Sequence, residues 1–191
     1  NIPANEDGVS KELADFRVEN YGNVRYKLNF NIPSTLDKTV DGVAEVNVQL
    51  AQPLPVILDF RADENQVKYV TANGANCKYI VENEHIIIEN TKQGANKIEI
   101  GFVSPNQSLN RREEFVYTLL VPDRARTLFP CFDQPNIKAR YTLTLNVPND
   151  WVAVANSREQ TTKQMGDHHE ISFIETEPLS TYLFAFVAGT I

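Results

Sequence analysis

Hydrophobic and polar residues alternate along most of the chain. In residues 26–32, Tyr26, Leu28 and Phe30 are separated by polar side chains. Successive side chains of a strand point to opposite faces, so a period of two predicts a strand with one buried face. Similar alternation predicts strands at 44–50, 97–102 and 140–147, and shorter apolar runs predict strands at 56–60, 67–71, 77–81, 85–89, 115–119, 169–173 and 181–188.

One segment near the amino end favours a helix instead. Residues 10–19 could form a short helix with Ser10 as its N-cap, and Leu13, Ala14 and Arg17 would share one face. Turn pairs such as Asp41-Gly42 and Asn73-Gly74 separate the strands that follow. Many short strands at close spacing indicate an all-β, mostly antiparallel sandwich or curved sheet. With no repeat and no low-complexity linker, residues 1–191 are predicted to form a single domain.

Composition narrows the function classes. The chain has 191 residues, of which 42% are hydrophobic, and a net charge of −7. Such an acidic chain without a basic cluster is not expected to bind nucleic acid, because phosphate contacts need clustered Lys and Arg. No apolar stretch approaches the roughly 20 residues that span a bilayer, so no membrane span is predicted. The compartment stays open, with a periplasmic or extracellular location favoured if a signal peptide was removed.

Side chains that could carry chemistry are few and scattered. The histidines are His85, His168 and His169, and the adjacent pair would point to opposite faces of a strand, so no metal site is predicted. His85 opens a strand and is expected at the surface. Cys77 and Cys131 could form one disulfide, although two free buried thiols are favoured. No G-x-S-x-G motif is present, and nothing in the sequence pairs two carboxyls across a cleft. No catalytic residue is therefore predicted in this chain.

The segment RTLFPCFDQPNIKA, residues 126–139, raises the sharpest question, because it places one acid in a stiff, apolar run. Pro130 and Pro135 restrict the backbone on either side of Asp133. Residue 135 has no N–H, so the carboxylate would cap a short helical turn through the N–H of Asn136.

A carboxylate packed among apolar side chains also needs a cation, because burying it alone costs several kcal/mol. The nearest cations are Arg126 and Arg124, and the apolar side chains near the carboxylate are Phe129 and Phe132. A structural corner formed by the motif residues is favoured over a catalytic acid: Arg126, Phe129, Pro130, Asp133 and Pro135.

These residues also carry a resemblance. The segments ARTLFPCFDQPNIKARYTLTLNVP, WVAVANS and LSTYLFAFVAG, with NVRYKLNFNIP, VILDF, GANKIEIGF and LNRREEFVYT upstream, occur in the order of the amino-terminal domain of the aminopeptidase N family of zinc peptidases. The pattern A-R-x-x-F-P-C-F-D-x-P is the specific part. The chain resembles that domain from about Leu13 onward.

The resemblance implies a saddle-shaped, mostly antiparallel β domain that packs on a thermolysin-like catalytic domain of the same polypeptide. That second domain carries the H-E-x-x-H zinc site and the G-x-M-E-N substrate motif, and neither motif occurs in this sequence. On this interpretation the chain is a fragment that is non-catalytic alone, needs no cofactor itself and walls the substrate chamber. The parent would use zinc to remove amino-terminal residues from peptides.

The resemblance also implies one substrate-binding position in this domain. A Gln or Glu just upstream of the motif reaches the substrate's free amine in the family, and that position falls at Val121, with Leu119 beside it. Three interpretations stay open. Asp123 or Glu114 could substitute, the amine could be held by the second domain alone, or the parent could lack ordinary aminopeptidase activity.

A different class of function is a stand-alone β-sandwich module that binds a glycan or a protein. Such a module would expose an aromatic platform, and the available aromatic side chains are Trp151 with Tyr141 or Tyr182.

Overall fold

The computed structural model describes residues 1–190 and confirms a mostly β protein with one helix. The helix α1 (Lys11–Asn20) comes first in the chain. The strands are β1 (Tyr21–Asn31), β2 (Asp41–Leu50), β3 (Val56–Asp59), β4 (Val67–Ala72), β5 (Ala75–Asn76), β6 (Tyr79–Glu82), β7 (His85–Ile88), β8 (Gly94–Val103), β9 (Leu109–Arg111), β10 (Phe115–Thr118), β11 (Arg140–Pro148), β12 (Val152–Ala155), β13 (Glu159–Gln164), β14 (His168–Phe173) and β15 (Phe186–Gly189). The short 3₁₀ helices are η1 (Glu64–Gln66), η2 (Ala125–Thr127) and η3 (Thr181–Leu183).

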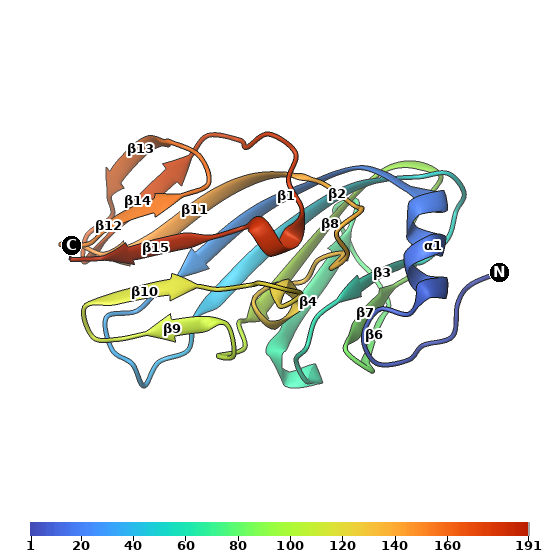
Figure 1. Cartoon of the computed structure of the whole chain (residues 1–191), viewed down its shortest axis with the longest axis horizontal. Helices are drawn as coiled ribbons and strands as arrows, with labels where there is room; N and C mark the ends of the chain where they lie inside the picture. The colour runs from blue at the N-terminus through green and yellow to red at the C-terminus, as the bar shows by residue number, and fades with distance from the viewer. Residues whose placement is uncertain (191) are drawn as a thin grey trace.

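The strands of the described part form three sheets. The largest has eight strands in the order β13-β14-β11-β1-β2-β8-β4-β5, the second is β12-β15-β10-β9 and the third is β3-β7-β6. In Figure 1 the large sheet runs behind the two small sheets, and α1 stands at the end where the chain begins. Pairing is antiparallel except between β1 and β11, which run parallel with Tyr26 opposite Tyr141.

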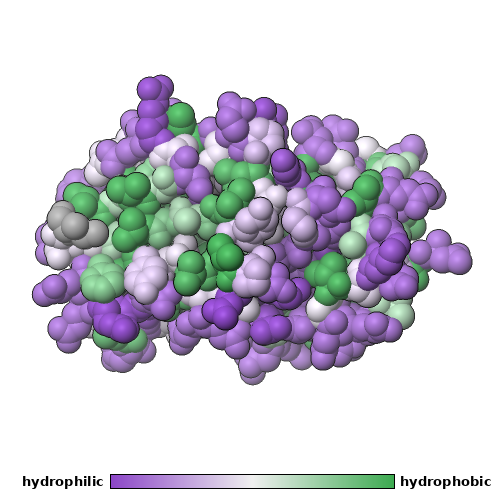
Figure 2. Space-filling view, viewed as in Figure 1, coloured by the Kyte–Doolittle hydropathy of each residue, from purple (hydrophilic) through white to green (hydrophobic). Residues whose placement is uncertain are grey.

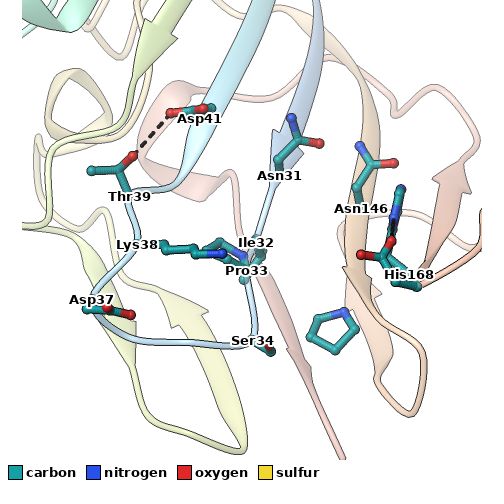
Figure 3. A pocket seen from close by; sticks show the side chains of 12 residues that line it. Asn31, Ile32, Pro33, Ser34, Asp37, Lys38, Thr39, Asp41, Asn146 and His168 are labelled. Atoms are coloured by element: carbon teal, nitrogen blue, oxygen red, sulfur yellow. Dashed lines mark hydrogen bonds and ion pairs between the residues drawn. The ribbon is translucent and has the colours of Figure 1, made fainter.

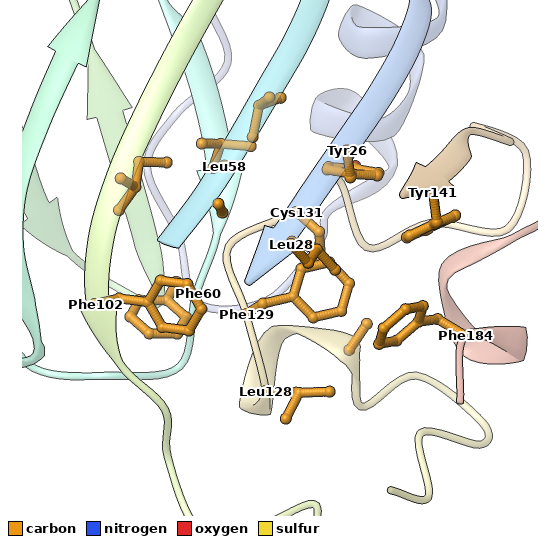
Figure 4. Close-up of a cluster of buried hydrophobic side chains, with 14 of the residues drawn as sticks. Tyr26, Leu28, Leu58, Phe60, Phe102, Leu128, Phe129, Cys131, Tyr141 and Phe184 are labelled. Carbon is orange, nitrogen blue, oxygen red and sulfur yellow. The ribbon is translucent and has the colours of Figure 1, made fainter. Parts of the chain in front are cut away.

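The core lies between the large sheet and the two small ones. Alternate residues of β1 and β11 are buried, as the period of two predicts, and the buried hydrophobic side chains join in one cluster. Aromatic rings fill its middle: Phe129 lies against Phe184 with ring centroids 5.4 Å apart, and Tyr141 stacks on Phe184 at 5.2 Å. Figure 4 shows these rings beside Tyr26 from β1.

The opposite face of the large sheet is polar. Glu45 of β2 lies between Lys27 of β1 and Lys97 of β8, with N···O distances of 3.6 and 3.1 Å. Both lysine side chains are more than half exposed. Exposed ion pairs of this kind contribute little to stability, but they are typical of a sheet face in contact with water.

The helix begins where the sequence predicts. The Ser10 Oγ accepts a hydrogen bond from the Leu13 N–H at 3.1 Å, which is the N-cap arrangement. Among residues 1–190, no helix has the length and hydrophobicity needed to cross a membrane.

The predicted strand at 181–188 is half wrong. Residues Thr181–Leu183 form the 3₁₀ helix η3, and only β15 is extended. The Thr181 hydroxyl donates a hydrogen bond to Asp133 Oδ1 at 2.8 Å, and the Phe184 N–H donates one to the Thr181 carbonyl at 3.1 Å. The predicted strand is therefore interrupted at η3, where Thr181 binds a residue far away in the sequence, although the apolar composition of the segment favours a strand.

Other differences concern segments without a clear pattern. Strand β13 was not predicted, because all its side chains are exposed and polar and no alternation marks it. The two cysteines are free: Cys131 is fully buried and Cys77 partly so.

Candidate functional site

Asp133 lies in a buried polar cluster that connects distant parts of the chain. One carboxylate oxygen, Oδ2, accepts a hydrogen bond from the Arg126 N–H at 3.1 Å, and Oδ1 accepts one from the Thr181 hydroxyl at 2.8 Å. The Arg126 Nε lies 3.9 Å from Oδ2. The Asp133 N–H donates to Asp59 Oδ2 at 2.8 Å. One residue thus links η2, η3 and β3.

The predicted N-cap at Asn136 is not formed. The two Asp133 oxygens instead accept hydrogen bonds from Arg126 and Thr181, and a turn at Pro135 and Asn136 replaces the expected helical turn. Phe129 and Pro130 are buried, whereas Pro135 is exposed and its carbonyl accepts from the Ser180 hydroxyl at 2.7 Å.

A buried ion pair lies next to Asp133 and was missed by sequence reasoning. Arg17 of α1 binds Asp59 of β3 through two parallel hydrogen bonds, Nη1 to Oδ2 and Nη2 to Oδ1, both 2.8 Å long. Both side chains are fully buried. The Arg17 Nη2 also donates to the Ile57 carbonyl at 2.7 Å. The only signal in the sequence was that Arg17 shares the apolar face of the helix with Leu13.

The expectation that His85 lies at the surface is wrong, because this residue is only 2% exposed. Its Nε2 lies 3.1 Å from Asp59 Oδ1 and 2.8 Å from the Gly8 carbonyl, and its Nδ1 lies 2.8 Å from Asn5 Oδ1. The amino-terminal segment covers the start of β7 at this point. A residue that opens a strand is buried here because an irregular segment far away in the sequence packs over it.

The two carboxyl groups have opposite pKa shifts. Burial raises the pKa of Asp133 above its ordinary value and the nearby Asp59 charge adds to this, while the Arg126 N–H and the Thr181 hydroxyl oppose it. Burial would also raise the pKa of Asp59, but the Arg17 charge and the hydrogen bond with His85 outweigh it and lower that pKa. The two environments differ because the Arg17 guanidinium binds Asp59 at 2.8 Å through two hydrogen bonds, whereas the Arg126 Nε lies 3.9 Å from Asp133.

This arrangement offers little room for chemistry on a substrate. The Asp133 side chain is 2% exposed, the Asp59 side chain is fully buried, and each carboxylate oxygen already accepts a hydrogen bond. Within residues 1–190, no group of three His, Cys, Asp or Glu side chains is placed to hold a metal ion.

The predicted substrate-binding position lies on the surface, just after β10. Val121 and Leu119 are each 53% exposed. Asp123 is exposed too, but its carboxylate is held by Arg126 Nη2 at 3.2 Å. Of the two acids that could substitute for Val121, Asp123 is therefore already paired.

An open polar cavity of about 750 Å³ lies elsewhere, where the loop after β1 faces β11 and β14. Figure 3 shows Asn31, Asn146 and His168 on one side and Lys38 and Asp37 on the other, with the Thr39 hydroxyl bonded to Asp41. Neither Asp133 nor Val121 lines this cavity.

A glycan-binding module would need an exposed aromatic platform, but two of the three candidate aromatic side chains are buried. Trp151 is 5% exposed and Tyr141 is 1% exposed, so neither ring is offered to a ligand. Tyr141 instead packs on Tyr26 and Phe184 in the core.

Comparison with known proteins adds independent findings. The family model for the peptidase M1 N-terminal domain matches residues 20–183. Aminopeptidase M1 from Arabidopsis thaliana is 38% identical over 78 residues, which are 41% of this chain and 9% of that protein. Human glutamyl aminopeptidase is 26% identical in an alignment that covers 96% of this chain and 22% of that protein.

A solved structure shows the same fold. The crystal structure of the M1 zinc metallopeptidase from Deinococcus radiodurans superposes with a TM-score of 0.78 and 19% sequence identity, covering 89% of this chain and 42% of that one. The chain thus spans less than a quarter of these two curated relatives and less than half of the solved neighbour.

Proposed function

The chain belongs to the peptidase M1 N-terminal domain family, and from this premise we propose that it is the non-catalytic first domain of a zinc aminopeptidase. It packs on a catalytic domain of the same polypeptide and forms one wall of the substrate chamber. The parent uses zinc held by that second domain to remove amino-terminal residues from peptides. The family match over residues 20–183 is the observation that carries this proposal.

Within this function, the motif around Asp133 serves as a structural brace. The support for this role is its set of contacts: its carboxylate receives the Arg126 N–H and the Thr181 hydroxyl, and its N–H binds Asp59. Phe129 and Pro130 anchor the same segment in the core, and Pro135 restrains the turn that leaves it. Through these contacts with three separate segments, the motif fixes the position of the chain just before β11 begins.

The first prediction separates this chain from its parent. The polypeptide encoded by the complete reading frame should bind about one zinc ion per chain and release the chromophore from aminoacyl p-nitroanilides, because the catalytic domain supplies the H-E-x-x-H ligands. The 191-residue chain alone should do neither. Metal analysis and the chromogenic assay, run on both proteins, check this.

Stoichiometric zinc or peptide cleavage in the 191-residue chain would contradict the fragment interpretation. A complete reading frame that encodes no H-E-x-x-H would contradict the proposed parent.

A second prediction concerns Val121, which we place beside the substrate's amino terminus in the parent. A valine cannot accept a hydrogen bond from an ammonium group. In the complete polypeptide, Val121→Gln should lower the KM for aminoacyl substrates about tenfold, because a hydrogen bond to a charged group contributes about 1.5–3 kcal/mol. Initial rates across substrate concentrations give KM and kcat.

Leu119→Gln is the matched control, since Leu119 has the same 53% exposure two residues earlier. Equal KM values for wild type and Val121→Gln, or equal decreases for both variants, would remove Val121 from the substrate site.

A further inference from the structure

The outer side of the four-stranded sheet is an apolar surface made by strands far apart in the sequence. We call this surface the β10–β12 face, and it consists of Phe115 and Tyr117 of β10, Val187 of β15, and Val152 and Val154 of β12. None of these five side chains carries a charge. In Figure 2 hydrophobic residues gather on the left part of the view, where β10 and β15 lie in Figure 1.

The strand register brings these residues together. Val187 pairs with Tyr117 on one side and with Val154 on the other, which makes one continuous row across three strands. Gly189 pairs with Phe115 and with Val152 in the next row. A Cβ on Gly189 would lie 2.6 Å from the Glu114 carbonyl oxygen and 2.7 Å from the Phe115 Cβ, so a glycine is needed where β15 passes the start of β10.

The alternation in this sheet separates a buried side from an apolar exposed side. The inward residues Val116 and Ala188 are fully buried. The outward residues Val152, Val154 and Tyr117 are 54%, 64% and 40% exposed. The row of β10 continues outward through Leu119 and Val121, each 53% exposed. Water-facing strands of soluble domains normally carry polar residues at outward positions.

The outer face of the large sheet, unlike the β10–β12 face, is charged. It carries the ion-paired side chains of Lys27, Glu45 and Lys97, of which both lysines are more than half exposed, whereas the five residues of the β10–β12 face carry no charge. Strand β12 is also the edge of its sheet, with an open backbone and two exposed valines. Unprotected apolar edges of this kind mark surfaces that another polypeptide covers.

We infer that the β10–β12 face is the surface on which the catalytic domain of the parent docks. This inference rests on the proposed function and adds which side of the domain is covered. The solved neighbour is more than twice as long as the part that this chain matches, so members of this fold carry enough further polypeptide to cover such a face. An uncharged, mostly aliphatic surface selects an apolar partner face, not a charged ligand.

Thiol labelling tests this placement directly. In a Cys77→Ser background, Val154→Cys places a thiol on β12, and Thr162→Cys places one on the exposed edge strand β13 of the large sheet. Cys131 stays silent because burial raises the pKa of its thiol well above the usual value. Maleimide labelling at each position is followed by peptide mass spectrometry, in the 191-residue chain and in the complete polypeptide.

Both thiols should label at similar rates in the 191-residue chain. In the complete polypeptide the Val154→Cys thiol should label at least about tenfold more slowly, because labelling then requires the domains to separate, while the Thr162→Cys thiol should not change. Fast labelling at Val154→Cys in a complete polypeptide that binds zinc and cleaves peptides would overturn the docking face and leave the proposed function intact. Absence of zinc and activity would instead overturn the proposed function.

A second copy of this chain is the competing occupant. If labelling of Val154→Cys in the 191-residue chain slows as its concentration rises, with a dimer seen by light scattering, the face is a self-association surface and the inference is wrong. A rate independent of concentration supports the catalytic domain as occupant.

Discussion

The Asp59→Asn variant of this chain should unfold roughly 6–20 °C below the wild-type protein. The Arg17–Asp59 pair is fully buried and bidentate, so a neutral amide would leave the Arg17 guanidinium without its counter-charge. Breaking a buried pair from one side costs about 3–5 kcal/mol. A chain of this size loses about 2–4 °C per kcal/mol. Thermal unfolding followed by circular dichroism measures the shift.

Asp15→Asn is the matched control. Asp15 also pairs with a cation, Lys11, at 2.7 Å, but its side chain is 66% exposed. Exposed pairs contribute little, so this variant should unfold close to wild type. Equal midpoints for the two variants would show that the buried pair does not stabilise the fold.

The same pair should determine the acid sensitivity of the fold. The pKa of Asp59 is lower in the folded protein than the ordinary value of about 3.9, so its stabilisation is present above about pH 4 and is lost as pH falls through the folded pKa. The contribution of Asp133 to stability has the opposite pH dependence. Because its pKa is raised in the folded protein, the folded state binds more protons than the unfolded state just above about pH 4, and this contribution grows as pH falls. Between about pH 5 and pH 3, Asp59→Asn should therefore lose less stability than wild type.

The regular strands were predictable because their pattern is local. In β1, β2, β8 and β11 most apolar side chains face the core and most polar ones face water, so a period of two appears in the sequence itself. The N-cap at Ser10 was also readable, since its bond to Leu13 spans only three residues. The parallel pairing of β1 with β11 has no such local signature.

The buried polar cluster could not be read in the same way. Arg17 and Asp59 are 42 residues apart, and each looks ordinary among its sequence neighbours. The sequence did indicate that Asp133 needs donors and a cation. It suggested the wrong donor, Asn136, because the hydroxyl actually used, on Thr181, is 48 residues away. Long-range satisfaction of buried groups is decided by tertiary packing, which local propensity does not encode.

Phe129→Ala is expected to be about as damaging as the loss of the ion pair. The Phe129 ring is fully buried and lies 5.9 Å from Tyr26, 6.4 Å from Tyr141 and 5.4 Å from Phe184, measured between ring centroids. Removing a buried phenylalanine costs about 3–5 kcal/mol, because the transfer free energy is lost and a cavity is left. The unfolding midpoint should then fall by roughly 6–20 °C.

Phe115→Ala gives the matched comparison, because it removes the same atoms from the partly exposed β10–β12 face. In the 191-residue chain it should lower the midpoint less than Phe129→Ala, since the Phe115 side chain is only partly removed from water on folding, whereas Phe129 is fully buried. In the complete polypeptide the cost at Phe115 should rise, because docking buries that ring, while the cost at Phe129 stays the same. Equal costs at both positions in the 191-residue chain would mean that Phe129 does not hold the motif segment in the core.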